Sequence, residues 1–357
     1  MEQFGIVGLP NAGKSALFNA LTGGSAAVAP HPFSTTETNI GVATVPDPRV
    51  DALAVMSASR KIVHATAEFV DIAGLQRGAS EGEGLGNRFL GGIREVDAVL
   101  FVLRAFADDN VVGGTDPIDD LHTLEFELTL ADLASAEQQL DRRRKAAKGD
   151  KSLASEVTAL EWAVAALAEG TPLYRADLTD ERRASLRPFF LLTTKPVLAV
   201  VNLGEDQLAD TSLVDAVAIE LGDAAEVLGV CVQLEAEASQ LPPDERVELL
   251  EGLGLGEGAL PRVARAAYHL LGLRTFLTTG DKESRAWTFR AGAKAPECAG
   301  VIHSDLQRGF IRAEVIHWDE LLELGSWNKA KEVGKLRVEG KDYEVADGDV
   351  LEIRFNV

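Results

Sequence analysis

The sequence predicts an α/β protein: a mostly parallel sheet domain, a helical hairpin inserted into it, and a small α+β domain at the C-terminal end. Three observations support this fold class. Short apolar runs alternate with longer helical patterns, a central stretch follows a helical seam instead, and glycines separate short strand-like pieces near the end of the chain. The predicted domains are residues 1–120 with 191–274, residues 121–190, and residues 275–357.

The apolar runs that predict the parallel strands end at positions able to contact a ligand. The runs cover residues 4–7, 67–70, 98–103 and 197–201. The first, second and fourth runs are directly followed by Gly8, Asp71 and Asn202. Ligands of open α/β sheets bind beyond the carboxyl ends of the strands, so we expect these three residues to meet at one site.

Residues 8–15 read Gly-Leu-Pro-Asn-Ala-Gly-Lys-Ser and directly follow the first apolar run, as a phosphate-binding loop requires. Gly8 and Gly13 permit backbone angles that let consecutive N–H groups point at phosphate oxygens. Lys14 should reach the β- and γ-phosphates as a catalytic group, and the Ser15 hydroxyl should ligate Mg²⁺. The loop predicts nucleoside triphosphate binding by Asn11, Ala12, Gly13, Lys14, Ser15 and Ala16.

The second apolar run is followed by Asp71-Ile72-Ala73-Gly74. Asp71 is expected to hold Mg²⁺ through a water, and the Gly74 N–H to contact the γ-phosphate during catalysis. Between the two motifs, residues 32–36 offer hydroxyl groups, and Thr35 is the expected catalytic Mg²⁺ ligand. An ordinary Ser/Thr-rich loop is the alternative for that segment.

Leu75 stands where many GTPases carry a water-orienting glutamine, and leucine has no group that could position water. Gln76 comes one residue late. The attacking water must therefore be positioned from elsewhere, or turnover is slow. The glycine-rich stretch 78–92 is expected to move and to order around the nucleotide.

The base pocket departs from the pattern of guanine-specific proteins. Guanine is normally read by Asn-Lys-x-Asp, whereas the fourth run ends in Asn202-Leu203-Gly204-Glu205. Losing hydrogen bonds to buried guanine donors costs about 1–3 kcal/mol for each group, enough to remove a guanine preference. The Asn202 amide matches the N6 amino group and N7 of adenine. We predict that Asn202, Leu203 and Glu205 contact the base; alternatively Asn202 only caps a loop and guanine still binds.

Apolar residues at 4-3-4-3 spacing predict the inserted hairpin. They are Leu153, Val157, Leu160, Val164 and Leu167, preceded by a weaker seam of Leu121, Leu124, Leu128 and Ala131. Between the two seams lies a polar turn with six basic side chains within residues 142–151. This basic tip is either a solvated turn or a contact for RNA phosphates.

The last part of the chain changes character. A short helix, residues 263–271, is expected after Pro261. Glycines then separate strand-like pieces, which predict a small domain with a mixed or antiparallel sheet. The pieces are residues 275–277, 286–289, 342–345 and 350–355.

Composition limits the possible partners and the compartment. The formal net charge is −21, which argues against nonspecific nucleic-acid binding by the whole surface. Cys231 and Cys298 are far apart and lack metal-ligand spacing, so buried free thiols are expected. Neither a signal peptide nor an apolar run of about 18 residues is present, so we expect a soluble, cytoplasmic protein that does not contact a membrane.

With these residues in view, the chain closely resembles the YchF/Obg-like ATPase family of translation-factor-class P-loop proteins. The shared stretches span essentially the whole chain. They are residues 8–15, 32–35, 69–75, 84–90, 201–206, 285–288, 309–313, 339–343 and 355–357.

The resemblance implies a nucleotide-binding domain, an inserted antiparallel coiled coil, and a C-terminal TGS domain of ubiquitin-like shape. It also implies binding of ATP, with GTP weaker, and association with the ribosome or a ribosomal subunit. Contacts with rRNA or tRNA through the basic tip and the TGS domain would follow. Asn11 matches an asparagine that helps hold K⁺ in potassium-activated relatives, or else is a turn residue.

One departure from the family concerns the attacking water. Many members carry a histidine in the loop after the third apolar run, where this chain reads Asp108-Asp109-Asn110-Val111-Val112-Gly113-Gly114-Thr115. His122 lies downstream and is expected on a helix. The preferred interpretation is a slow, Mg²⁺-dependent ATPase switch. The alternatives are an Obg-type GTPase and a nucleotide-gated binding module with negligible hydrolysis.

Overall fold

The computed structural model describes residues 2–23, 39–72, 85–108 and 113–356. The chain forms two compact units. Unit 1 comprises Met1–Ala43 and Glu68–Ala267, and unit 2 comprises Thr44–Ala67 and Tyr268–Val357. The predicted three-domain boundaries remain a prediction.

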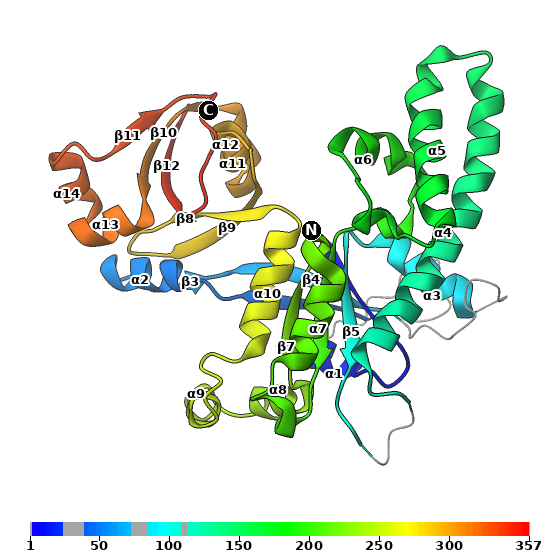
Figure 1. The fold of residues 1–357 in the computed structure, drawn as a ribbon. Helices are drawn as coiled ribbons and strands as arrows, with labels where there is room; N and C mark the ends of the chain where they lie inside the picture. The colour runs from blue at the N-terminus through cyan, green and yellow to red at the C-terminus, as the bar shows by residue number, and fades with distance from the viewer. Residues whose placement is uncertain (1, 24–38, 73–84, 109–112, 357) are drawn as a thin grey trace. The chain divides into compact units, whose positions relative to one another are not determined.

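A six-stranded sheet forms the centre of unit 1, in the order β2-β4-β1-β5-β6-β7 (Figure 1). The pairs β1–β4, β1–β5, β5–β6 and β6–β7 are all parallel. Every residue of β5 and β6 is buried, as strands covered on both faces require. The strands are β1 (Gln3–Val7), β2 (Asn39–Val45), β4 (Ala65–Asp71), β5 (Ala98–Arg104), β6 (Val197–Asn202) and β7 (Ala225–Val230). The four predicted apolar runs are therefore all strands.

Two sequence-based expectations about the helices need correction. The helix expected from residue 263 begins at Ala259, because Pro261 lies in the first turn, where its missing N–H is not needed. Residues 85–92 of the glycine-rich stretch are helical rather than a loop, and residues 78–84 lie outside the described residues. The helices are α1 (Lys14–Leu21), α3 (Leu85–Glu95), α4 (Pro117–Ala147), α5 (Ala154–Ala168), α6 (Asp180–Leu186), α7 (Ser212–Leu221), α8 (Val232–Ser239), α9 (Pro243–Gly252) and α10 (Ala259–Leu270).

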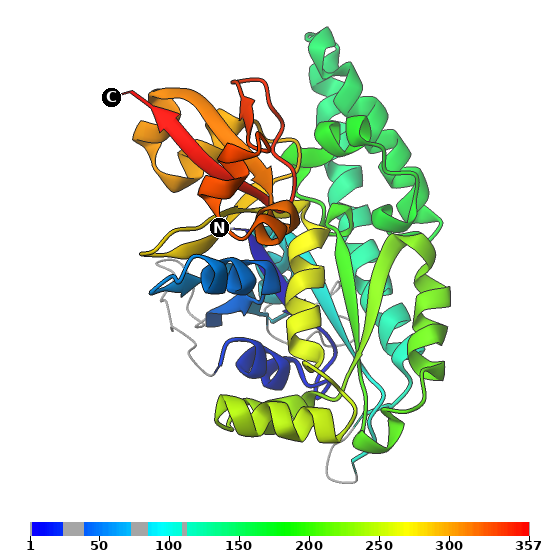
Figure 2. The same ribbon diagram turned by 90° about the vertical axis from the view of Figure 1, so that its left-hand side faces the viewer.

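Helices α4 and α5 form the predicted antiparallel hairpin, which projects from the sheet as a long arm (Figures 1 and 2). Asp116 caps α4 by accepting a hydrogen bond from the Ile118 N–H, with Pro117 at the first helical position. At 1.5 Å per residue, the 31 residues of α4 span about 46 Å. The seam between the helices is apolar and buries Ala136, Leu140, Ala159, Leu160, Ala163 and Leu167.

Unit 2 is built on a second six-stranded sheet, in the order β11-β10-β12-β8-β9-β3. The pairs β10–β11, β10–β12 and β8–β9 are antiparallel, while β12–β8 and β3–β9 are parallel. The sheet is therefore mixed, which is one of the two forms that the sequence predicted. Its elements are α2 (Pro48–Met56), β3 (Ile62–Val63), β8 (Leu273–Thr278), β9 (Ser284–Arg290), α11 (Ala295–Ile302), α12 (Ser304–Arg308), β10 (Phe310–His317), α13 (Trp318–Leu324), α14 (Trp327–Glu332), β11 (Arg337–Glu339) and β12 (Asp349–Phe355).

The strand expected over residues 342–345 is wrong. Glu344 forms only an isolated bridge with Lys294. The Val345 N–H donates to the Ala293 carbonyl oxygen, and the Tyr343 carbonyl oxygen accepts from the Ala295 N–H. The Ala346 N–H and the Tyr343 hydroxyl both donate to Asp349. Strands β10 and β11 were not among the predicted pieces.

Residues 44–67 belong to the packing of unit 2, although they precede most of unit 1 in sequence. Strand β3 pairs with β9 at Ile62 and Val63. The Arg49 guanidinium donates to Asp47 at 2.8 Å and, 298 positions away, to Asp347 at 2.7 Å. This ion triad fastens the start of α2 to the C-terminal sheet.

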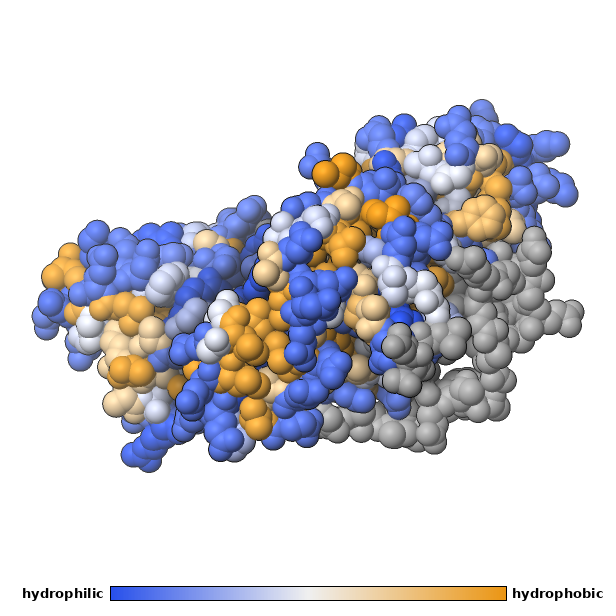
Figure 3. All heavy atoms as spheres, turned by 60° about the horizontal axis from the view of Figure 1, so that its bottom comes forward, coloured by the Kyte–Doolittle hydropathy of each residue, from blue (hydrophilic) through white to orange (hydrophobic). Residues whose placement is uncertain are grey.

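Hydrophilic residues cover most of the face drawn in Figure 3, and hydrophobic residues gather near its middle. Across the described residues, no helix combines the length and apolar character needed to cross a bilayer. Cys231 and Cys298 are both buried and unbridged, which confirms the prediction of free thiols.

Candidate nucleotide site

The phosphate-binding loop connects β1 to α1 and is held against the ends of two neighbouring strands. Asn11 and Gly13 adopt positive φ angles of 66° and 97°. A Cβ atom on Gly13 would lie 2.3 Å from Asn202 Nδ2, and one on Gly8 would lie 2.5 Å from the Val102 carbonyl oxygen. Both glycines are therefore required by close packing against β5 and β6, and Gly13 also by its backbone angle.

Lys14 is the first residue of α1 and is only 8% exposed. Its Nζ atom donates to the Leu9 carbonyl oxygen at 2.8 Å, across its own loop. Burial lowers the pKa of Lys14, and the carboxylates of Asp71 and Asp120 oppose that shift. The ammonium group thus lies within electrostatic range of two carboxylates.

Ser15 and Asp71 bring together the start of α1 and the end of β4. The Ser15 hydroxyl donates to Asp71 Oδ2 at 2.8 Å. Burial raises the pKa of Asp71, while the Ser15 hydrogen bond and the Lys14 charge oppose the increase. A hydroxyl and a carboxylate oxygen are donors that Mg²⁺ accepts.

The same pair fits Mg²⁺ bound together with phosphates. Within the described ranges, no three His, Cys, Asp or Glu side chains are placed to hold a metal by themselves. Mg²⁺ commonly takes one or two protein oxygens and completes its shell with water and phosphate oxygens. Thr35 and Gly74, the other predicted metal and catalytic residues, lie outside the described residues.

Asp120 is a residue near the loop that sequence reasoning missed. It lies in the first turn of α4, is 6% exposed, and accepts a hydrogen bond from the Arg104 backbone N–H at 2.9 Å. Burial raises its pKa, and the Arg104 hydrogen bond opposes the increase. The hairpin helix therefore begins beside the end of β5 and within electrostatic range of Lys14. In sequence, Asp120 is indistinguishable from the acidic residues that favour any helix N-terminus.

A cavity of about 690 Å³ adjoins the loop on the side of β6. It is lined by the three predicted base-contact residues, Asn202, Leu203 and Glu205, and by Gly13 and Ala16 of the loop and α1. The same cavity is lined by residues that sequence reasoning missed: Phe106, Ala107, Asp108, Gly204, Asp206, Val232, Gln233, Ala236, Glu237 and Gln240.

Phe106 offers the cavity an aromatic wall two residues beyond β5. The Arg104 guanidinium carbon lies 4.5 Å from the Phe106 ring centroid, and Arg104 Nε donates to the Phe106 carbonyl oxygen. This stacking holds the ring in place. An aromatic residue directly after a strand that borders the loop was the available sequence signal.

Asn202 has a structural role. It is 4% exposed; its Nδ2 donates to the Ala12 carbonyl at 2.9 Å, and its Oδ1 accepts from the Val232 N–H at 3.2 Å. The side chain thus ties the loop to the first turn of α8. Its Oδ1 serves α8, so the second N–H of Nδ2 is the group that can face a base acceptor such as adenine N7.

Among the contacts described for His122, none reaches the phosphate-binding loop. His122 lies on α4, as expected, and its Nε2 is 3.1 Å from Glu220 Oε1 on α7. The hydrogen bond from His122 lowers the pKa of Glu220, and a second hydrogen bond, from Arg175, lowers it further. The structure thus gives His122 a role in joining α4 to α7. Leu75, Gln76 and residues 109–112 lie outside the described part of the chain.

The six basic residues at the tip of the hairpin fall into two groups. Arg143 pairs with Glu156 at 3.0 Å and Arg144 with Glu161 at 2.7 Å, so both join α4 to α5. The other four are exposed and form no ion pair with any residue that the structure describes: Arg142, Lys145, Lys148 and Lys151. Only these four present uncompensated charge to a partner.

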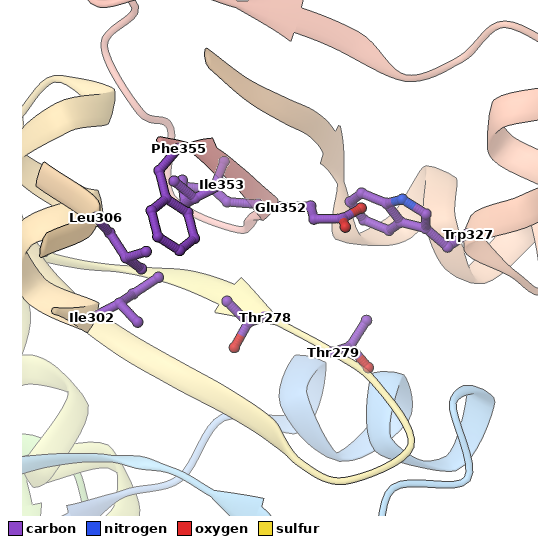
Figure 4. A pocket seen from close by; sticks show the side chains of 9 residues that line it. Thr278, Thr279, Ile302, Leu306, Trp327, Glu352, Ile353 and Phe355 are labelled. Atoms are coloured by element: carbon purple, nitrogen blue, oxygen red, sulfur yellow. The ribbon is translucent and has the colours of Figure 1, made fainter. Parts of the chain in front are cut away.

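Unit 2 contains a pocket of about 410 Å³ (Figure 4). Its lining is largely apolar, and its one carboxylate, Glu352, pairs with Arg354 at 3.0 Å. The residues that line it are Thr278, Thr279, Ile302, Leu306, Trp327, Leu351, Glu352, Ile353 and Phe355. It lacks the cation and metal-ligand pair that distinguish the site in unit 1.

Two family models match the chain. Residues 3–153 match a model described as 50S ribosome-binding GTPase. Residues 273–356 match the model YchF-GTPase_C, described as a protein of unknown function (DUF933). The first match covers the loop, Asp71 and helix α4, and the second covers nearly all of the C-terminal part of unit 2.

Full-length relatives extend this likeness over the whole chain. The chain is 47% identical over 361 residues to "Ribosome-binding ATPase YchF" of Bacillus subtilis (strain 168), covering 99% of each chain. It is 47% identical over 358 residues to the protein of that name in Haemophilus influenzae, again covering 99% of each. A solved structure, "Structure of the Schizosaccharomyces pombe YchF GTPase", matches with a TM-score of 0.86 and 31% identity, covering 99% of this chain and 97% of that one. The predicted fold class is confirmed.

Proposed function

The chain belongs to the YchF family, and from this premise we propose that it is a ribosome-associated P-loop ATPase switch that hydrolyses ATP slowly to ADP and phosphate. One observation carries the proposal. Among the described residues, the phosphate half of the site brings together Lys14 and the Ser15–Asp71 pair, while the base half lacks the lysine and aspartate of guanine-specific proteins.

The chain's own residues bind and orient the triphosphate for in-line attack of water on the γ-phosphorus. Lys14 and the loop N–H groups would neutralise the charge that develops on the phosphate oxygens, and the Gly74 N–H is proposed to contact the γ-phosphate. Ser15, Thr35 and Asp71 would hold Mg²⁺, which supplies further charge neutralisation when bound. Asn11 would assist a K⁺ ion beside the phosphates.

Adenine is the proposed base. Leu203 replaces the lysine that normally stacks on guanine, and with Phe106 it gives the cavity apolar walls suited to any purine. Glu205 is one methylene longer than the aspartate that accepts from guanine. The remaining N–H of Asn202 Nδ2 can donate to N7, which adenine and guanine share. Selection against guanine therefore rests on the absent lysine and on the longer Glu205 in place of the aspartate.

Titration of the purified chain with ATP and GTP in Mg²⁺ tests the base assignment. We expect ATP to bind more tightly than GTP. Replacing Leu203 with Lys and Glu205 with Asp together restores the guanine pattern and should raise GTP affinity by about tenfold or more. Much tighter binding of GTP than ATP by the unaltered chain would instead support an Obg-type GTPase.

Measuring phosphate release distinguishes between two functions of the chain, an ATPase and a nucleotide-gated binding module. The measurement compares the unaltered chain with Lys14→Ala, with and without K⁺ and ribosomes. We expect slow release that Lys14→Ala abolishes. Equal rates in the two proteins would favour the binding module, for which the leucine at position 75 and the loop without histidine are the motivation.

The hairpin is proposed to contact the ribosome through rRNA or tRNA phosphates at its basic tip. Changing Arg142, Lys145, Lys148 and Lys151 to Ala should weaken cosedimentation with ribosomes and reduce its salt dependence. The matched control is Arg143→Ala with Arg144→Ala, which removes cations already paired with glutamates. Unchanged cosedimentation of the first variant would leave the tip as a solvated turn. The same experiment with nucleotides shows whether this contact responds to ATP.

A further inference from the structure

Behind the base cavity, on the other side of α8, lies a smaller cavity of about 250 Å³. Leu203 lines both cavities. The apolar side chains in the walls of the smaller cavity come from α7, β7, α8 and the loops near them: Leu203, Leu208, Val214, Val227, Val230, Leu234 and Leu255. Asp210, Thr211, Asp215 and Arg262 also line it and are exposed, so they mark its opening to solvent.

Glu235 is a buried carboxylate in the lining of this cavity. It lies on α8 and is only 2% exposed. Its Oε1 accepts a hydrogen bond from the backbone N–H of Ala259, the first residue of α10. Its Oε2 is buried and has no hydrogen-bond partner within the described chain. One oxygen therefore caps a helix, and the other is left unsatisfied.

The backbone around Glu235 keeps this arrangement in place. Gly258 has a φ of +87°, and a Cβ atom there would lie 2.9 Å from Glu235 Oε1 and 3.1 Å from Oε2. Only glycine allows the chain to approach the carboxylate so closely. Arg262, one turn into α10, is exposed and forms no ion pair with Glu235 among the described residues. The carboxylate is thus built into the wall and forms no ion pair with any residue that the structure describes.

We propose that this cavity binds a small organic ammonium ion, whose N–H groups donate to Glu235 and whose short apolar body packs against the leucine and valine walls. A buried carboxylate oxygen without a partner is costly, and a cationic donor satisfies both its charge and its hydrogen bond. Water could donate a hydrogen bond to Oε2 but would leave the carboxylate without a cationic partner. Metal binding is disfavoured, since the described residues offer no cluster of three ligands.

The test uses the full chain without nucleotide, so its outcome is independent of the proposed ATPase activity. Thermal unfolding is followed in increasing n-butylammonium chloride, with KCl at equal ionic strength and n-butanol, its uncharged counterpart, as controls. We expect a saturable rise in the melting temperature with n-butylammonium alone. Glu235→Gln, which keeps an acceptor for the Ala259 N–H, should weaken the apparent affinity at least about tenfold.

Three results would overturn the proposal: no saturable effect of the amine, an equal effect of n-butanol, or an equal effect of K⁺. If circular dichroism shows that Glu235→Gln does not fold, Thr211→Trp provides the second test. Thr211 is exposed at the opening of the cavity, so a tryptophan there should narrow the opening. This variant should retain the fold and lose the response to the amine. A Thr211→Trp protein that responds like the unaltered chain would also contradict the proposal.

Discussion

At the scale of single residues, the site depends on contacts between the loop and the strand ends. Gly13 leaves room for the Asn202 amide, and that amide in turn holds the Ala12 carbonyl and the start of α8. The phosphate loop and the wall of the base cavity are thus fastened by one side chain. A change at Gly13 should therefore disturb both.

Gly13→Ala is predicted to destroy nucleotide binding. Alanine at a φ of +97° costs about 1–2 kcal/mol in backbone strain, and its Cβ would lie 2.3 Å from Asn202 Nδ2. We expect ATP affinity to fall more than about tenfold in calorimetry. Gly149→Ala, whose Cβ meets nothing closer than 3.8 Å, is the matched control. Unchanged affinity in Gly13→Ala would contradict the close packing described here.

The two cysteines are predicted to be inert in the folded chain. Burial raises the pKa of Cys231, and burial together with the nearby carboxylates Glu297 and Asp349 raises that of Cys298 to about 12. The thiolate is the reactive form and increases only as the pH approaches these raised values. Labelling with a disulfide reagent should therefore be slow at pH 8 and accelerate with pH, whereas the urea-unfolded chain should react at once. Rapid labelling of the folded chain at pH 8 would refute this.

At the scale of elements, a buried carboxylate anchors the hairpin to the segment that leads into β6. Asp132 on α4 accepts hydrogen bonds from the N–H groups of Leu192 and Thr193 and from the Thr193 hydroxyl, at 2.7–2.8 Å. Just beyond that turn, Lys195 Nζ donates to the Arg94 and Val96 carbonyl oxygens at the end of α3. The segment that leads into β6 thus joins α3 to the hairpin.

Asp132→Ala should cost about 3 kcal/mol of unfolding free energy, because it leaves two buried N–H groups without acceptors. Asp132→Asn keeps one acceptor and should cost less. Urea denaturation measures both, with the exposed Asp141→Ala as a control expected to stay within about 0.5 kcal/mol of the unaltered chain. A loss no greater than that of the control would mean that this anchor contributes little.

At the scale of the whole molecule, the chain passes into unit 2 twice. Residues 44–67 supply α2 and β3, and Arg49 joins Asp47 to Asp347, whose other oxygen accepts from the Thr275 N–H of β8. The C-terminal residues alone therefore lack a strand and an ion triad of their own unit. A model that matches only residues 273–356 covers an incomplete structural unit.

Arg49→Ala is predicted to destabilise unit 2 by about 2 kcal/mol, since it leaves Asp47 and Asp347 without their shared cation. Tryptophan fluorescence during urea unfolding reports mainly on this unit, because three of the four tryptophans, Trp287, Trp318 and Trp327, lie in it. Arg60→Ala, an exposed arginine on the same segment, is the control. A fragment of residues 268–357 should likewise unfold more readily than the full chain.

By itself, the sequence determined the local structures: the phosphate loop, four strands of the parallel sheet, the hairpin and the buried thiols. Each is encoded within a few neighbouring residues, through hydrophobic period, glycine placement or helix seams. The extra turn of α10 and the missing strand at 342–345 show the limit of that code. A proline in a first turn decides the one, and hydrogen bonds to the distant residues Ala293 and Ala295 decide the other.

Only the tertiary structure decided which distant residues meet. It placed residues 44–67 in unit 2, turned Asn202 toward Ala12 and Val232, brought Asp120 near Lys14, and paired two of the six tip cations with glutamates. Such contacts join positions up to 298 residues apart, so no local pattern carries them. They exist because burial forces polar groups to find partners wherever the fold supplies them.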